Sequence, residues 1–250
     1  MRAPGANALS VAEHTIALLL ATVKQIVPLV SGLRDGRWEK PGFLGVEIAG
    51  KTLGLVGFGA IAQHTARLGR GLGLNVVAYD PMAQDSVFAA EGVQRIASVD
   101  ELLAIADIVS LHCPLMPATQ HMINAQSLQI MKPQSYLINT ARGGLISETD
   151  LLMALQSGHI AGAGLDTFEH EPPSPDNPLM NERTVVVTPH VGGVTAAAGR
   201  RVGLLAVEGI IDLLAGKKIA AERIVNPEIF AAGTARLLMS GVDAKLFEKG

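Results

Sequence analysis

The stretch that decides the fold runs from Leu53 to Ala62 and reads Leu-Gly-Leu-Val-Gly-Phe-Gly-Ala-Ile-Ala. Its first four residues form a short apolar segment of strand length, and the sequence predicts a helix that begins near Ala60. The G-x-G-x-x-A turn between them uses Gly57 for the tight bend and Gly59 for the close approach of a pyrophosphate. Small Ala62 then lets the helix pack closely against the strand. This order of strand, turn and helix indicates a dinucleotide-binding unit.

An acidic residue stands where such a unit needs one. Asp80 lies 80 − 57 = 23 positions after Gly57 and directly follows the second predicted strand. A carboxylate there accepts hydrogen bonds from a ribose 2′-hydroxyl and repels a 2′-phosphate, which favours NAD over NADP. The alternative is that small residues merely form a tight strand-to-helix turn. The strand, the helix and the acid occur together, and this combination favours nucleotide binding.

Segments of strand length alternate with helical segments along most of the chain. The expected strands are 52–57, 75–79, 93–96, 107–112, 135–139, 161–165 and 184–188. The helices between them are expected to begin near Ala60, Asp85, Ser98, Asn124 and Ser147. Strands that are apolar on successive residues are typical of a parallel sheet covered by helices on both faces. Seven of them with helical crossovers predict an α/β fold with a doubly wound parallel sheet, the Rossmann type.

Helical segments flank this alternating region. Apolar residues recur at helical spacing over 10–33, Ser10 with Glu13 forms a capping-box pattern, and Pro28 is expected to kink or end the helix. A last helix is expected over 195–215. The predicted organisation is a long first helix over 1–34, a nucleotide-binding domain over 35–194, a C-terminal helical segment over 195–227 and a tail over 228–250.

Composition limits the classes of function. The 250 residues are 48% hydrophobic and 17% charged, which predicts a sizeable folded core. The net charge is −3 and no basic run exceeds a pair, so neither a nucleic acid nor an anionic membrane is expected as a partner. One cysteine, Cys113, excludes an intramolecular disulfide and favours a reducing compartment. The longest apolar run, 15–23, is too short to span a bilayer. We therefore expect a cytoplasmic protein, and we expect no metal site.

Three charged or titratable residues follow the later strands: Arg142, Glu171 and His190. Ligands of open α/β sheets bind outside the carboxyl ends of the strands, so all three are expected to face one crevice with the cofactor. His190 can exchange a proton near neutral pH, Glu171 can pair with it, and Arg142 can bind a carboxylate and polarise a carbonyl. Such a set suits reduction of a 2-oxo acid. Taken singly, the three residues have ordinary alternatives, namely a surface ion pair, a solvated loop residue and a structural histidine.

The chain resembles the D-isomer-specific 2-hydroxyacid dehydrogenase family from about Gly5 to Pro227. The matching runs are SVAEH (10–14), GFGAIA (57–62), YDP (79–81), HCPL (112–115), NTARGG (139–144), GLD (164–166), EPP (171–173) and TPH (188–190). The resemblance implies that Arg142, Glu171 and His190 are the catalytic set. Family members usually carry a larger piece of substrate domain ahead of the first helix, and the resemblance implies that this sequence lacks it.

The resemblance also implies NAD as the cofactor and a small 2-oxo or 2-hydroxy acid as the substrate. The implied cofactor contacts are Gly57, Gly59, Ala60, Ile61, Asp80, Cys113, Pro114, Thr119, Thr140, Ala141, Asp166 and Gly192. Ala60, Ile61 and Asp80 would lie on the pyrophosphate and adenosine side, whereas Asp166 and Gly192 would approach the nicotinamide. The first helix resembles the one through which the family commonly dimerises, so a homodimer is expected.

Three hypotheses follow from these features. The first is an NAD-dependent oxidoreductase that transfers a hydride between NAD(H) and a 2-hydroxy or 2-oxo acid. The second is a truncated NAD-binding module, a sensor or interaction protein with little turnover, and NADH binding without oxidation by any 2-oxo acid would favour it. The third is a Rossmann enzyme that uses another nucleotide, such as an S-adenosyl compound. That hypothesis leaves Arg142, Glu171 and His190 without a shared task.

Overall fold

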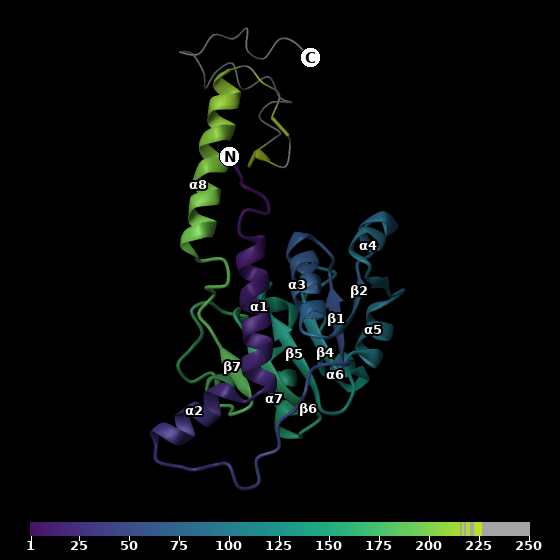
Figure 1. Ribbon diagram of the computed structural model, residues 1–250, viewed down its shortest axis with the longest axis vertical. Helices are drawn as coiled ribbons and strands as arrows, with labels where there is room; N and C mark the ends of the chain where they lie inside the picture. The colour runs from purple at the N-terminus through teal and green to yellow at the C-terminus, as the bar shows by residue number, and fades with distance from the viewer. Residues whose placement is uncertain (216, 218, 221–222, 227–250) are drawn as a thin grey trace. The chain divides into compact units, whose positions relative to one another are not determined.

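Seven parallel strands form one sheet in the order β3-β2-β1-β4-β5-β6-β7 (Figure 1). The computed structural model describes residues 1–215, 217, 219–220 and 223–226. The strands are β1 Thr52–Val56, β2 Asn75–Tyr79, β3 Gln94–Arg95, β4 Ile108–Leu111, β5 Ser135–Asn139, β6 Ile160–Leu165 and β7 Val185–Val187. The predicted doubly wound α/β fold is therefore confirmed. The strand order reverses between β1 and β4, where open sheets of this kind bind their ligands.

The register brings the carboxyl ends of the strands to one edge. Val56 at the end of β1 pairs with Tyr79 at the end of β2 and with Leu111 at the end of β4. Asn139 at the end of β5 pairs in turn with Leu165 at the end of β6. Segments that are far apart in the sequence therefore leave the sheet beside one another, and this arrangement positions the candidate site.

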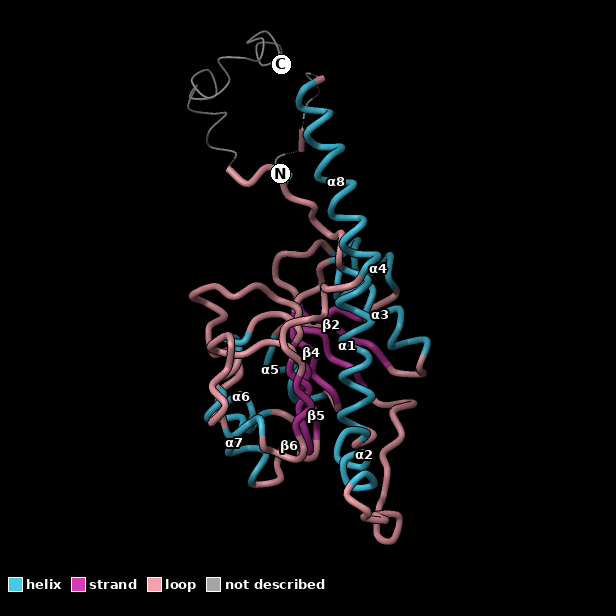
Figure 2. Tube along the Cα trace, turned by 90° about the vertical axis from the view of Figure 1, so that its left-hand side faces the viewer, coloured by secondary structure: helices cyan, strands magenta, loops and turns pink. Residues whose placement is uncertain are grey.

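Helices cover both faces of the sheet (Figure 2). The helices of the described chain are α1 Ala8–Val23, α2 Ile26–Arg34, α3 Ala60–Gly71, α4 Asp85–Glu91, α5 Val99–Ile105, α6 Ala125–Ile130, α7 Glu148–Gln156 and, in the second compact unit described below, α8 Ala196–Leu214. Leu19 of α1 and Phe58 belong to the core on the face of α1, α3 and α4. Leu102 of α5 and Leu151 of α7 belong to the core on the opposite face. Every residue of β4 and β5 is buried, as expected for strands covered on both faces.

The first helical segment is broken earlier than its proline suggested. α1 and α2 meet at 60°, and Gln25 between them has a left-handed backbone with φ of 53°. Pro28 lies in the first turn of α2, where a missing N–H removes no helical hydrogen bond. The predicted capping box of Ser10 with Glu13 is wrong, because α1 begins at Ala8 and Ser10 is a buried residue inside it.

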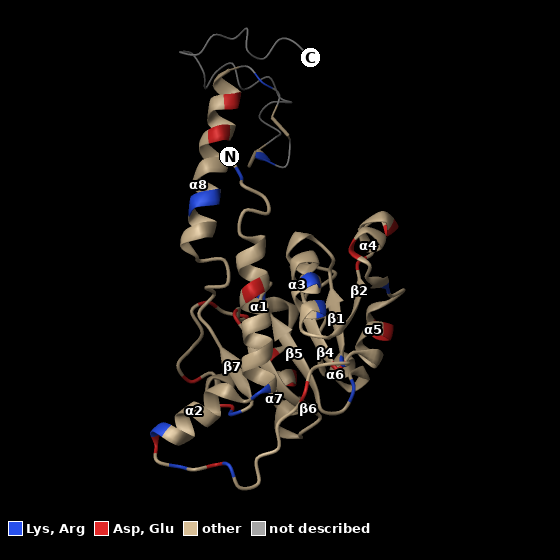
Figure 3. Cartoon of the chain, viewed as in Figure 1, with Lys and Arg blue, Asp and Glu red and all other residues tan. Residues whose placement is uncertain are grey.

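No single helix in the described part of the chain is long and apolar enough to cross a membrane. α1 and α2 taken together meet those criteria of length and composition, but only as a sharply bent pair. Ten of the 16 residues of α1 are buried, and Glu13 is its one charged residue (Figure 3). α1 contacts β5, β6 and β7, so packing against the sheet accounts for its apolar character.

The chain divides into two compact units, one of residues 8–193 and one of residues 1–7 with 194–250. In the second unit, Thr195 caps α8 by accepting a hydrogen bond from the Ala198 N–H at 3.0 Å. Arg201 Nε donates to the Ala6 carbonyl at 2.7 Å, which ties this helix to the first residues of the chain. The expected tail over 228–250 lies outside the described residues.

Gly54 in β1 provides a test of how tightly α5 packs on the sheet. A Cβ at this position would lie 2.6 Å from Leu102 Cδ2 and 2.9 Å from Ala106 Cβ, and both residues are fully buried. We expect Gly54→Ala to lower the free energy of unfolding by about 1–3 kcal/mol, measured by urea denaturation. Gly71→Ala is the matched control, because no atom lies within 4 Å of a Cβ there. Equal stability of the two variants would contradict this account of the packing.

Candidate active site

The predicted site residues all lie beyond the carboxyl ends of strands. By strand they are Gly57, Gly59, Ala60 and Ile61 after β1; Asp80 after β2; Cys113, Pro114 and Thr119 after β4; Thr140, Ala141 and Arg142 after β5; Asp166 and Glu171 after β6; His190 and Gly192 after β7. Because the strands are parallel and in register, these segments form one edge of the sheet.

The glycine turn after β1 is built for close approach. Gly57 has φ of 92°, and its N–H donates to the Tyr79 carbonyl at 2.7 Å. A Cβ at Gly57 would come within 2.7 Å of the Cys113 backbone nitrogen, so a side chain is excluded there. Gly59 is different, because no protein atom lies within 4 Å of a Cβ at that position. The turn is therefore closed on the protein side and open on the other.

The N-terminus of α3 faces this open space. Its N-cap residue is Gly59, and no side chain caps it. The first amide N–H groups, including those of Ala60 and Ile61, have no intrahelical acceptor, and with the helix dipole they favour an anion. Ala62 is fully buried, as the motif predicts for close packing of helix on strand. The residues of this turn fit a dinucleotide pyrophosphate.

Asp80 has a structural role that sequence reasoning missed. Its Oδ2 accepts the Phe58 N–H at 2.8 Å, and its Oδ1 accepts the N–H groups of Met82 and Ala83 at 2.8 and 3.1 Å. The carboxylate thus ties the glycine turn to the end of β2. A carboxylate offers about four acceptor positions, so one remains for a ribose hydroxyl.

Cys113 contributes a small partly buried side chain. Its Sγ lies 3.6 Å from Met122 Sδ. Burial, assisted by the charge of Asp80, raises the pKa of the Cys113 thiol to about 11. The thiol therefore stays protonated at neutral pH, and Cys113 forms part of the wall of the site instead of supplying a nucleophile.

Two of the expected cofactor contacts turn their hydroxyls toward the protein. Thr119 Oγ1 donates to the Pro114 carbonyl at 2.8 Å and so shapes its own loop. Thr140 Oγ1 lies 2.7 Å from Thr15 Oγ1, and both side chains are buried. Thr15 itself donates to the Val11 carbonyl, so Thr140 is the donor to Thr15. These hydroxyls support the site from within the fold.

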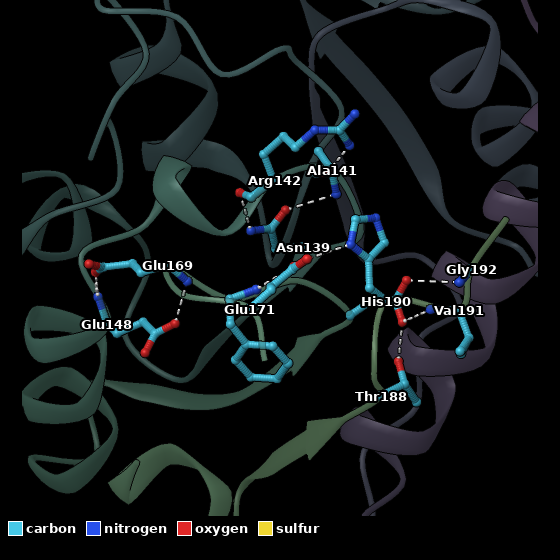
Figure 4. Close-up of polar contacts among 12 residues, drawn as sticks. Asn139, Ala141, Arg142, Glu148, Glu169, Glu171, Thr188, His190, Val191 and Gly192 are labelled. Atoms are coloured by element: carbon cyan, nitrogen blue, oxygen red, sulfur yellow. Dashed lines mark hydrogen bonds and ion pairs between the residues drawn. The ribbon is translucent and has the colours of Figure 1, made fainter. Parts of the chain in front are cut away.

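The turn after β5 presents Arg142. Fully buried Asn139 fixes this turn, because its Nδ2 donates to the Arg142 carbonyl at 2.9 Å and its Oδ1 accepts the Ala141 N–H at 3.0 Å (Figure 4). The exposed Arg142 side chain donates from Nη1 to the Ala141 carbonyl. A Cβ at Gly143 would lie 1.8 Å from the Phe168 carbonyl carbon. The loops after β5 and β6 are therefore in direct backbone contact.

Glu171 and His190 form a hydrogen-bonded pair at this edge. Glu171 Oε2 lies 2.8 Å from His190 Nδ1, and Glu171 Oε1 accepts the Phe168 N–H at 3.1 Å (Figure 4). Partial burial alone would raise the pKa of Glu171, but these hydrogen bonds and the charges of His190 and Arg142 bring it below the ordinary value. Glu171 is therefore an ionised acceptor at neutral pH, and Nδ1 of His190 carries the shared hydrogen.

His190 has a left-handed backbone, with φ of 53°, that Asp166 holds in place. The Asp166 carbonyl accepts the His190 N–H at 2.8 Å. The buried Asp166 carboxylate accepts from Thr188 Oγ1 at 2.6 Å, from the Val191 N–H at 2.9 Å and from the Gly192 N–H at 2.8 Å. A strained backbone persists only where its surroundings fix it, and these bonds do so at His190.

His14 of α1 joins this network, and sequence reasoning recorded it only as part of a matching run. Its Nε2 lies 2.9 Å from Thr188 Oγ1 and 3.3 Å from Asp166 Oδ1. A Cβ at Gly192 would lie 3.2 Å from His14 Cδ2, so the glycine lets the turn approach the ring. A histidine within a mostly apolar helix was the signal that could have identified it.

Comparison with known proteins agrees with this arrangement. Residues 16–192 match the family model for the NAD-binding domain of D-isomer-specific 2-hydroxyacid dehydrogenases. The chain belongs to this family. The match covers the glycine turn, Arg142, Glu171 and His190, and it makes NAD the cofactor of this domain.

Relatives carry several dehydrogenase names. The chain is 40% identical to the D-3-phosphoglycerate dehydrogenase of Methanocaldococcus jannaschii, over 90% of this chain and 43% of that protein. It is 42% identical to the hydroxypyruvate reductase of Thermotoga maritima, over 86% of this chain and 69% of that protein. The crystal structure of D-mandelate dehydrogenase from Rhodotorula graminis superimposes with a TM-score of 0.80 at 33% identity. The superposition covers 86% of this chain and 65% of that one. The chain thus spans less than half the length of some curated relatives.

His112, beside the glycine turn, should make stability depend on pH. Burial lowers the pKa of His112 to about 4, against an ordinary value near 6.5. Between these values the unfolded chain binds a proton that the folded chain does not, so stability rises with pH through this window. We expect protonation of His112 in the unfolded chain to lower the free energy of unfolding by about 2 kcal/mol at pH 5 relative to pH 7. Urea denaturation at both pH values should show a smaller difference for His112→Gln, and an unchanged difference would contradict the prediction.

Proposed function

We propose that this chain supplies the NAD-binding and catalytic part of an NAD-dependent D-2-hydroxyacid dehydrogenase. The observation that carries the proposal is the Glu171–His190 pair, with 2.8 Å between Oε2 and Nδ1, on the sheet edge that also bears the open glycine turn. Arg142 stands close enough for its charge to lower the pKa of Glu171. When bound, NAD(H) supplies or accepts the hydride.

His190 is the proton donor and acceptor in this proposal. Its Nδ1 donates to Glu171, which fixes the tautomer and leaves Nε2 as the nitrogen for substrate. In the reductive direction, Nε2–H transfers its proton to the oxygen of the substrate carbonyl. In the oxidative direction, Nε2 accepts the proton of the substrate hydroxyl. Glu171 stabilises the imidazolium form that each cycle requires.

Arg142 binds the substrate in this proposal. A guanidinium has five N–H donors, and the contact of Nη1 with the Ala141 carbonyl occupies one nitrogen. The remaining donors suit the carboxylate of a small 2-oxo acid and can polarise its carbonyl. Names of relatives range over several acids, so the proposal extends to the class of substrate and to no single member.

An NAD-binding module with little turnover is the second candidate. One observation favours it: the side chains of His190 and Glu171 are 47% and 37% exposed. Reduction of a carbonyl benefits from exclusion of water around the reacting groups. NADH titration by fluorescence, followed by a panel of 2-oxo acids with absorbance read for oxidation, separates the candidates. Binding without oxidation would favour the module.

We expect His190→Ala to lower turnover by ~10²- to 10⁴-fold, because His190 is the group proposed to exchange the substrate proton. NADH affinity, measured in the same titration, should stay within about threefold of the unsubstituted chain. His64→Ala, on the outer side of α3, is the control for loss of a histidine and should leave both quantities unchanged. Equal loss of NADH binding and turnover in His190→Ala would show that His190 is structural.

We also propose that the chain forms a homodimer through α2 and the loop after it. Large apolar side chains are exposed there. Leu44 is 87% exposed, and the others are between 43% and 71% exposed: Ile26, Val27, Val30, Leu33 and Trp38. Apolar surface of this kind favours association. Sedimentation velocity should show a species of two 26.1-kDa chains. Val30→Asp should shift it to monomer, and Met153→Asp on α7 should not; a monomeric unsubstituted chain would refute the proposal.

A further inference from the structure

Two glutamates outside the catalytic set bind each other's backbone. Glu169 Oε1 accepts the Glu148 N–H at 2.7 Å, and Glu148 Oε1 accepts the Glu169 N–H at 2.7 Å (Figure 4). The second oxygen of Glu148 accepts from Asn177 Nδ2 at 2.6 Å. We call this reciprocal pair the glutamate clamp. Both carboxylates are partly buried and turned to the backbone, so neither resembles a solvated surface acid.

The clamp joins the two loops that carry the catalytic residues. Glu148 is the first residue of α7 and follows the segment that begins at Arg142, through the short helix Gly143–Leu145. Glu169 lies two positions before Glu171 in the loop after β6. The loops already touch at their backbones, because a Cβ at Gly143 would overlap the Phe168 carbonyl. The clamp therefore fixes both loops on either side of that contact.

A third loop reaches the same point. The His121 N–H donates to the Gly144 carbonyl at 2.8 Å, and His121 Nε2 lies 3.6 Å from Glu169 Oε2. Glu169 also places a negative charge at the N-terminus of α7, where the helix dipole favours it. No three His, Cys, Asp or Glu side chains gather as a metal site in the described part of the chain. The bonds of the two carboxylates to backbone N–H groups therefore account for their placement.

We propose that Glu148 and Glu169 are positioning residues that set the geometry of Arg142 relative to the Glu171–His190 pair. The proposal rests on the function proposed above, because its effect on rate requires that function. Glu171 accepts the Phe168 N–H, the donor one residue before Glu169, so a shift of Glu169 moves the support of Glu171 as well. The contact between the loops after β5 and β6 thus helps to position Arg142 and the Glu171–His190 pair together.

Substitutions that keep or remove the acceptor oxygen test this role. Glu169→Gln keeps a carbonyl oxygen for the Glu148 N–H, whereas Glu169→Ala removes the acceptor. We expect Glu169→Ala and Glu148→Ala to lower kcat by ~10- to 100-fold, since small misplacements of reacting groups have effects of this size. Glu169→Gln should retain most of the rate. The double alanine variant should lose no more than either single one, because both remove the same unit.

Two further readouts separate positioning from general damage. NADH affinity should stay within about twofold in every variant, because the glycine turn follows another strand and shares no contact with the clamp. Hydrogen–deuterium exchange of the unliganded chain should rise over 142–148 and 166–171 together in Glu169→Ala, and stay unchanged in Glu169→Gln. Glu101→Ala is the matched control, since Glu101 is an acid in the first turn of α5.

The outcomes decide both proposals separately. Loss of kcat in the alanine variants with retained NADH affinity and rescue by Gln supports the clamp. Unchanged kcat, or equal loss of NADH binding, overturns it. If the unsubstituted chain binds NADH but oxidises it with no 2-oxo acid, the proposed function fails. Hydrogen–deuterium exchange in Glu169→Ala then tests the clamp without any measurement of rate. A rise confined to one loop would overturn it, and a rise in both loops would support it.

Discussion

The buried carboxylate of Asp166 holds the turn on which the whole candidate site depends. A carboxylate removed from water is costly unless donors replace its hydration, and here the donors come from Thr188, Val191 and Gly192. Those same bonds set the path of the backbone on both sides of His190. The left-handed conformation of His190 is therefore a consequence of satisfying one buried charge, and α1 contributes to it through His14.

The carboxylates along this edge of the sheet fall into two groups. Asp80, Asp166, Glu148 and Glu169 accept backbone N–H groups and thereby join loops that follow different strands. Glu171 also accepts one backbone N–H, but its second oxygen meets an imidazole that is open to a ligand. Parallel strands leave many loop amides at one edge without ladder partners, and acidic side chains satisfy them. These bonds connect the loops of the edge, and the glycine turn and Arg142 offer donors to a ligand there.

Most of the fold could be predicted from the sequence, and so could the sheet edge at which Arg142, Glu171 and His190 lie. Apolar runs predicted the seven strands, and Ser98, Asn124 and Ser147 are N-caps where helices were expected to begin. The same local logic failed at Ser10, since a Ser-x-x-Glu pattern also occurs inside a buried helix. Asp80, His14 and the glutamate clamp could not be assigned their bonds in advance. The bonds by which they join different loops span 21 or more positions, and no periodic pattern links an acid to a distant backbone N–H.

The exposure of Glu171 and His190 shows how much of their arrangement depends on the backbone behind them. A carboxylate–imidazole pair whose side chains are 47% and 37% exposed gains little from electrostatic attraction, because water screens it. Attraction between charges therefore does not by itself account for the arrangement of His190 beside Glu171. That arrangement depends on the neutral backbone bonds behind both residues, at Phe168 for Glu171 and at Asp166 for His190. Any surface that covers this edge would exclude water and strengthen a pair whose geometry the fold has already set.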